Sequence, residues 1–178
     1  MSKIEEVHKE IRIATNSSLL AFGLLSCERL YPNYNFFSQE YNFGNSSILM
    51  KGIRFINDVL ILKTIIDKKD LSILIAEIDS VTPLPENFDT ILSSSALDAC
   101  TALMESLSFL LDGNIQRIID VSTFCTDTVN MYIQSRDNLS YDDISFWTKI
   151  NTDPLMIREI NTQKEILKTI KGEKKNHT

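Results

Sequence analysis

The chain has 178 residues with a formal net charge of −6, and 43% of its side chains are hydrophobic. This length suits a single domain that can bury a core without the help of a metal or a disulfide. The longest apolar stretch, residues 19–25, is too short to cross a bilayer, and charged side chains stand where a signal peptide would be apolar. We therefore expect a cytoplasmic protein.

In the first half of the chain, apolar residues recur at helical spacing. A capping-box pattern at Ser2 and Glu5 begins the first predicted helix, and a second, mostly apolar helix covers residues 15–30. Pro32 is expected to end that helix, because its ring removes a donor and crowds the preceding turn. A short aromatic helix should follow. The next predicted boundaries are a C-cap at Gly44 and helix starts at Asn45 and Asp70.

The second half continues the helical pattern after a loop at residues 81–93, which contains two prolines. Another capping-box pattern, at Ser95 and Asp98, is expected to begin a helix that reaches Leu111. The later predicted boundaries are a break at 112–114, a capping box at Ser140 and Asp143, and a last helix from Asp153-Pro154 to Gly172. The sequence thus predicts an all-α, single-domain bundle of about eight helices over residues 1–171, with a disordered tail at 172–178.

Several short sequence words also resemble a known family. They are Cys-Glu-Arg-Leu-Tyr-Pro-Asn-Tyr at 27–34, Phe-Gly at 43–44, Leu-Asp-Ala-Cys at 97–100, Ala-Leu at 102–103, Val-Ser at 121–122 and Thr-Val at 128–129. Over roughly residues 20–135, and in this order, they are similar to the YjaG-like family, a bacterial family of all-helical proteins of unknown function. The resemblance implies an all-helical fold and supplies no catalytic residue.

The side chains that most enzymes use are few and poorly spaced. The two histidines, His8 and His177, lie far apart, and the three cysteines form no Cys-x-x-Cys pair. No glycine-rich dinucleotide motif or phosphate loop is present in the sequence. We therefore predict no enzymatic activity, no metal and no cofactor, and we expect Cys27, Cys100 and Cys125 to be buried, reduced thiols.

Glu28, Arg29 and Asp98 are charged residues inside otherwise apolar predicted helices. One interpretation is a structural polar core, in which Arg29 pairs with a buried carboxylate and fixes how two central helices meet. The alternative is a pair of carboxylates, Glu28 and Asp98, that performs acid–base work or holds a metal. We favour the structural interpretation, because Asp98 also fits the capping box.

Charge is distributed unevenly along the chain. Residues 70–153 carry fourteen acidic and only three basic side chains, whereas the segments on either side have a net positive charge. The acidic residues that we expect to lie in loops and contact a partner are Asp79, Glu86, Asp89, Asp137, Asp142 and Asp143. Such a surface repels nucleic acid and anionic membranes and attracts a basic protein. The alternative is a solvated face that keeps the protein soluble.

These features suggest a small acidic protein that binds a basic partner. The specific hypothesis is an immunity protein that neutralises a toxin nuclease, as in contact-dependent growth inhibition. The second hypothesis is a housekeeping member of the YjaG-like family with a regulatory or scaffolding role. A hydrolase or metal enzyme that uses Glu28 and Asp98 is the third.

Overall fold

A computed structural model describes residues 3–63 and 65–172, which form helices and connecting loops without a β-strand. The elements are α1 (Lys3–Arg12), α2 (Asn16–Tyr41), α3 (Ser46–Leu62), α4 (Lys68–Ser80), the 3-10 turn η1 (Pro85–Asn87), α5 (Ile91–Asp112), α6 (Ile115–Asp137), α7 (Phe146–Thr152) and α8 (Pro154–Gly172). The all-α prediction and the number of helices are confirmed for this part of the chain. None of its helices is long and apolar enough to cross a membrane.

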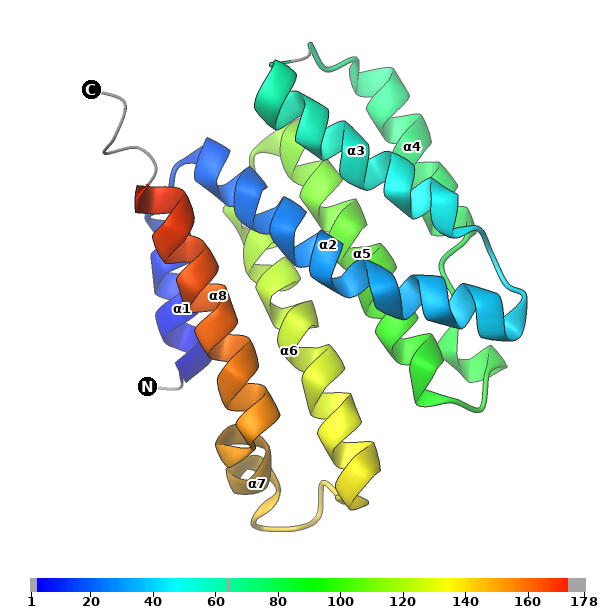
Figure 1. The fold of residues 1–178 in the computed structure, drawn as a ribbon, viewed down its shortest axis with the longest axis vertical. Coiled ribbons are helices and arrows are strands. Elements are labelled where there is room, and N and C mark those ends of the chain that lie inside the picture. Colours follow the sequence, from blue (N-terminus) through cyan, green and yellow to red (C-terminus); the bar gives the residue numbers. More distant parts are fainter. Residues whose placement is uncertain (1–2, 64, 173–178) are drawn as a thin grey trace.

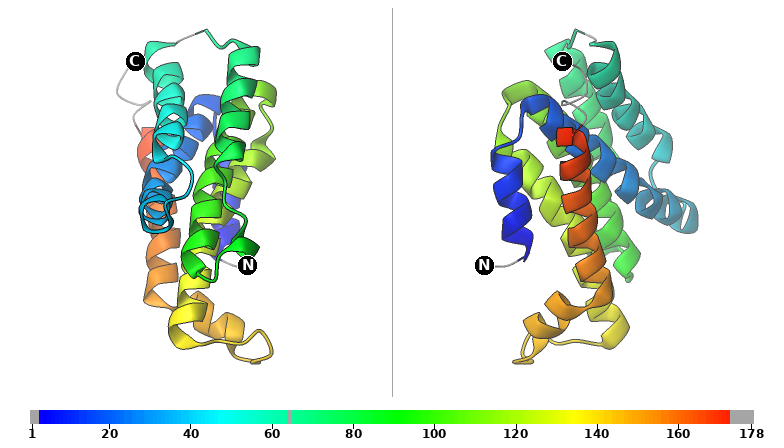
Figure 2. Two further views of the ribbon diagram at one scale, coloured as in Figure 1. Left: turned by 90° about the vertical axis from the view of Figure 1, so that its right-hand side faces the viewer. Right: turned by 60° about the vertical axis from the view of Figure 1, so that its left-hand side comes forward.

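The helices pack in three groups (Figure 1). α2, α5 and α6 lie in the middle, α3 and α4 cover one side, and α1, α7 and α8 cover the other. The contact between α2 and α5 is the most extensive in the molecule. Buried apolar side chains from all eight helices meet in one core. The loop between α6 and α7, together with α7 itself, projects at one end of the bundle (Figure 2).

Side-chain caps determine most of the helix starts. The N-cap residues whose side chains accept a hydrogen bond from a backbone N–H of the first turn are Thr15, Asn45, Asp67, Thr90 and Asn114. Asn45 is confirmed as a start, whereas α4 starts two residues before Asp70. The predicted cap at Ser2 lies outside the described residues. Gly172 is the last residue of α8, so the helix reaches one residue into the predicted tail, and the rest of that tail is not described.

The predicted helix break at Pro32 is wrong, because α2 continues through it for nine more residues. Pro32 is exposed, and the carbonyl that loses its N–H partner belongs to Glu28, an exposed residue four positions earlier. Water can therefore satisfy this carbonyl. Tyr34 and Phe37, which follow the proline, are fully buried and hold the second half of α2 against the core.

Two predicted capping boxes are also wrong. α5 begins at Ile91 rather than Ser95, so that Asp98 lies in the helix interior and is 8% exposed. α7 begins at Phe146, and the Asp143 carboxylate instead accepts hydrogen bonds from the backbone N–H and the hydroxyl of Ser145. In both places a serine and an aspartate three residues apart match the spacing of a capping box, but the helix begins at another residue.

Gly23 allows α2 and α5 to approach closely. A Cβ atom at this position would lie 2.8 Å from Ser106 Oγ and 3.4 Å from Ile118 Cδ1. Ser106 is buried, donates to the Ala102 carbonyl and contacts the Cys27 sulfur, 3.4 Å away, so its side chain has little room to move. A larger residue at position 23 must therefore push the two helices apart.

We expect Gly23→Val to lower the free energy of unfolding by roughly 2–3 kcal/mol through overpacking at this contact. A thermal melt would then shift down by about 5–10 °C for a chain of this length. The second-site variant Ser106→Gly should restore part of the loss, because it removes the atoms that the new side chain meets. A melt of Gly23→Val equal to that of the parent would show that α2 and α5 do not approach closely here.

Candidate functional site

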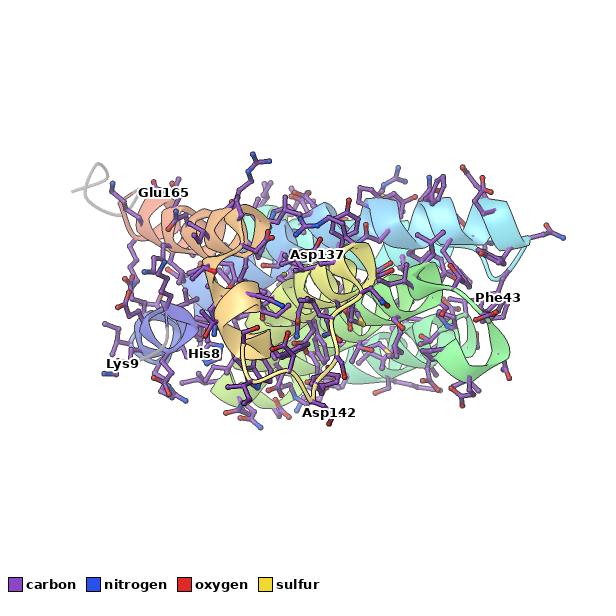
Figure 3. All side chains as sticks on the ribbon, turned by 90° about the horizontal axis from the view of Figure 1, so that it is seen from below. His8, Lys9, Phe43, Asp137, Asp142 and Glu165 are labelled. Carbon is purple, nitrogen blue, oxygen red and sulfur yellow. The ribbon has the colours of Figure 1, made fainter. Side chains whose placement is uncertain are left out.

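The six predicted partner-binding acids fall into two groups on different parts of the molecule. Glu86 and Asp89 lie on the connection between α4 and α5, with Asp79 in the last turn of α4 just before it. Asp142 and Asp143 lie in the loop between α6 and α7, with Asp137 as the last residue of α6. The expectation of a loop position is therefore wrong for Asp79 and Asp137, which are helical. Figure 3 shows Asp137 near the middle of the view, Asp142 at the lower margin, and Phe43, which packs beside the α4–α5 connection, toward the right. The acids therefore do not form one continuous patch.

An aromatic cluster supports the α4–α5 connection. The ring of Phe88 packs 4.9 Å from Phe37, 5.7 Å from Tyr41 and 5.3 Å from Phe43, measured between ring centroids. The hydroxyl of buried Tyr34 donates to the Val81 carbonyl at 2.8 Å and so ties the end of α4 to α2. These contacts give the connection a fixed position although it contains little regular structure.

We call the exposed part of this region the α4–α5 acidic face. It consists of Tyr41, Asp79, Leu84, Glu86 and Asp89. Tyr41 is 42% exposed and Leu84 is 55% exposed, so two apolar side chains reach the solvent beside three carboxylates. Among the described residues, none of these three carboxylates has a cationic partner. The face therefore combines exposed apolar anchors with uncompensated negative charge.

The α6–α7 acids differ, because nearby cations neutralise most of them. Arg136 binds both Asp137 and Asp153 at 2.6 Å, and Lys149 binds Asp143 at 2.7 Å. These hydrogen bonds hold the pKa of each of the three carboxyls below its usual range. Asp137 and Asp143 therefore present less uncompensated negative charge than Asp142, and the role of this group in partner binding stays a prediction.

The predicted polar core exists with different members. Arg29 on α2 forms an ion pair with Glu159 on α8, which is 7% exposed, while Glu28 faces the solvent. The second oxygen of Glu159 accepts a hydrogen bond from Gln163 at 2.9 Å. Gln163 also bonds the hydroxyl and the carbonyl of Ser122 on α6. A chain of polar contacts thus joins α2, α8 and α6 inside the core, and Glu28 is not part of it.

Asp98 belongs to a separate polar contact. Its carboxylate accepts a hydrogen bond of 2.7 Å from the Thr128 hydroxyl on α6, and burial raises its pKa to about 7. No hydrogen bond joins Asp98 to Arg29 or Glu28 within the part of the chain that the structure describes. The two carboxylates of the enzyme hypothesis thus lie in different environments, with Glu28 exposed and Asp98 buried.

The described residues also contain no group of three or more histidine, cysteine or acidic side chains that could hold a metal. The cysteines Cys27, Cys100 and Cys125 are free and buried, as expected. Burial raises the pKa of Cys27 and Cys100 to about 12, which keeps both thiols protonated at neutral pH.

Glu159 and Gln163 were missed in the sequence, although they make the polar contacts that hold α8. The sequence pattern predicts only the bounds of this helix and no role for its polar residues. One signal was available: Glu159 and Gln163 are four residues apart and share a helix face with the apolar Met156 and Leu167.

We expect Arg29→Met to destabilise the fold by roughly 2–4 kcal/mol, because it leaves Glu159 as an unpaired buried carboxylate. The Arg29 side chain is 33% exposed, so the loss should lie below that of a fully buried pair. Chemical denaturation of Arg29→Met beside the double variant Arg29→Met/Glu159→Met measures this loss. The double variant should recover most of the stability, since it removes both charges. Equal stability of the parent and the single variant would contradict a structural role for this pair.

The pKa of Asp98 leads to an expected pH dependence. Its folded pKa of about 7 lies above the ordinary value of 3.8, so the folded protein binds the proton more tightly than the unfolded chain does. The contribution of Asp98 to stability is therefore fully present below about pH 4 and is lost as the pH rises toward 7. We expect Asp98→Asn to gain stability relative to the parent between pH 5 and pH 8. Denaturation curves at both pH values check this, and a constant difference between the two proteins would contradict it.

A family model described as "Protein of unknown function (DUF416)" matches residues 6–178. The chain is 25% identical over 165 residues to the uncharacterized protein YjaG of Escherichia coli and of Salmonella typhimurium, covering 92% of this chain and 81% of each relative. It is 21% identical to an uncharacterized protein of Haemophilus influenzae, over 93% of this chain and 82% of the relative. The resemblance to the YjaG-like family is therefore confirmed, and it extends well beyond residues 20–135.

The fold also resembles a solved structure. The crystal structure of a DUF416 family protein from Shewanella baltica superposes with a TM-score of 0.84 at 22% sequence identity, covering 93% of this chain and 84% of the other. At this identity the likeness shows the fold alone. The family match covers nearly the whole chain, and the chain belongs to the DUF416 family of proteins of unknown function.

Proposed function

We propose that this chain is a non-enzymatic protein-binding module that binds and neutralises a basic protein through the α4–α5 acidic face. The specific partner that we propose is the nuclease domain of a toxin, which makes the chain an immunity protein of the contact-dependent growth inhibition type. The observation that carries the proposal is a set of three carboxylates that have no cationic partner among the described residues, near the exposed Tyr41 and Leu84. The proposed place of action is the cytoplasm, where a nuclease would reach nucleic acid.

The composition of this face suits a protein partner. Interfaces gain most of their affinity from a few aromatic or large apolar anchors, and charges at the rim steer the partner and set its orientation. Tyr41 and Leu84 can act as anchors, while Asp79, Glu86 and Asp89 supply the rim charge. The same carboxylates repel phosphate groups, so the face is unsuited to nucleic acid. A nuclease domain that binds nucleic acid carries the complementary positive surface.

The interior supports a non-enzymatic role. The candidate catalytic carboxylates have separate environments, with Glu28 in the solvent and Asp98 buried against Thr128. Arg29 and Glu159 bind each other and so serve the packing of α2 against α8. Each of these groups therefore has a position that packing or solvation explains.

A regulatory or scaffolding role in a housekeeping protein is the second candidate. It is favoured by the relatives in Escherichia coli, Salmonella typhimurium and Haemophilus influenzae, each matched over about four fifths of its length. The position of the gene separates the two candidates. An immunity gene should lie directly downstream of the region that encodes the C-terminal domain of a toxin, and a housekeeping gene should lie among unrelated metabolic genes.

The direct experiment measures binding of this chain to the purified C-terminal domain encoded upstream, with a charge-reversal pair on the α4–α5 acidic face. We expect Asp79→Lys/Glu86→Lys to weaken binding by about tenfold or more, mostly through slower association, because it reverses two steering charges. Association of the parent should slow steeply as salt rises, while dissociation changes less. Stopped-flow association rates and inhibition of the nuclease measure both effects.

The matched control is Glu28→Lys/Glu165→Lys, which changes the net charge by the same amount at two exposed acids outside the face. This control should bind almost as well as the parent, and thermal melts should show that both variants are folded. Equal losses in the two variants would show that net charge alone matters and would contradict the proposed face. Salt-independent binding, or a gene with no toxin region upstream, would contradict the immunity proposal and favour the second candidate.

A further inference from the structure

A cavity of about 520 Å³ lies between α2, α5, α6 and α8, away from the α4–α5 acidic face. This volume falls in the range of small-molecule sites, roughly 300–1,000 Å³. The residues that carry the argument are Arg29, Val129, Tyr132, Leu155, Arg158 and Glu159. The cavity is thus a feature that neither the family match nor the proposed function explains.

The wall formed by α8 has a regular arrangement. Leu155, Arg158, Glu159 and Thr162 stand at the i, i+3, i+4 and i+7 spacing that places side chains on one helix face. Opposite them, Ile91 and Leu92 of α5 and Val129 of α6 supply apolar surface. The cavity therefore has apolar side chains on α5 and α6, and both charged side chains and Leu155 on α8.

The charged groups around the cavity leave it positive. Glu159 is the carboxylate of the lining, and both of its oxygens already accept hydrogen bonds, from Arg29 and from Gln163. A guanidinium has five N–H donors, so Arg29 keeps donors that its contact with Glu159 does not use. Arg158 forms no ion pair with another described residue. The lining thus contains two guanidinium groups, of Arg29 and Arg158, and the carboxylate of Glu159, whose two oxygens already accept hydrogen bonds.

Two further acids bond lining residues: Asp98 accepts from the Thr128 hydroxyl, and Asp153 accepts from the Leu155 backbone N–H. The charge of Asp153 is offset by its ion pair with Arg136. Asp98 itself is buried beneath this wall, and its pKa of about 7 leaves much of the carboxyl neutral at neutral pH. It therefore offsets little of the positive charge. The local charge of the lining therefore favours an anionic ligand, although the chain as a whole has a net charge of −6.

We propose that this cavity binds a small amphipathic monoanion, namely a carboxylate or a sulfonate on an apolar body. The acidic head would accept hydrogen bonds from Arg158 and from the free donors of Arg29, which suit such a group in a forked geometry. The apolar body would lie against Val129, Leu155 and the ring of Tyr132. This site is separate from the α4–α5 acidic face and does not depend on the proposed function.

The test uses three probes that share one apolar body and differ in charge: octanoate, octanol and octylammonium. We expect isothermal titration calorimetry of the full chain to give octanoate a Kd of about 1 mM or tighter, in keeping with a ligand of this size. Octanol and octylammonium should bind at least about tenfold more weakly, because they lack the charge that the guanidinium groups recognise. Octanoate that binds no better than octanol, or does not bind, would overturn the proposal.

Two variants test whether octanoate binds in this cavity. Arg158→Gln should weaken the binding of octanoate by about tenfold, which is the usual contribution of a charge-assisted hydrogen bond. The matched control Arg54→Gln, at an exposed residue of α3 that does not line the cavity, should leave the affinity unchanged. Ser95→Phe adds a ring at the α5 wall and should abolish binding, with a thermal melt to show that the variant is folded. Unchanged affinity in Arg158→Gln or in folded Ser95→Phe would show that octanoate binds elsewhere and would overturn the site.

Discussion

The close contact between α2 and α5 at Gly23 and Ser106 determines where the other helices can lie. Gly23 has no Cβ, and one at that position would lie 2.8 Å from Ser106 Oγ, so the backbone of α2 lies directly against a side chain of α5. α6 packs against both of them, while α3 and α8 pack against α2 on opposite sides. α2 continues through Pro32, and it therefore extends from the contact with α8 to the aromatic cluster beside the α4–α5 connection. One helix thus links the polar core to the proposed binding face.

Polar groups inside and outside the bundle differ in how they are paired. In the interior, Glu159 is bonded by Arg29 and Gln163, and Asp98 is bonded by Thr128, so burial is compensated by specific partners. On the surface, Arg136 and Lys149 neutralise the acids around the α6–α7 loop. The α4–α5 connection has no such cation among the described residues, yet Tyr34 and the aromatic rings hold it in place. The α4–α5 acidic face therefore has both a fixed position and uncompensated charge. For this reason we propose that the partner binds there.

Helical periodicity and short polar caps were sufficient to predict the all-α fold, and Asn45 and Pro154 start helices as expected. Local rules failed where long-range packing decides the outcome. Tyr34 and Phe37 anchor α2 beyond Pro32, so burial outweighs the lost hydrogen bond. The partner of Arg29 lies 130 residues away on α8, a distance that spacing within one helix cannot reveal. The ion pair between Asp143 and Lys149 could not be predicted for a similar reason, since it depends on how the loop turns.

Amide hydrogen exchange of this chain, alone and with the proposed basic partner domain, tests the central claim most directly. If the α4–α5 acidic face is the interface, residues 79–89 and the last turn of α2 should gain protection in the complex, because both border the exposed Tyr41 and Leu84. The α6–α7 loop, residues 138–145, should exchange as it does in the free chain. Protection of residues 138–145 without any change at residues 79–89 would contradict the account.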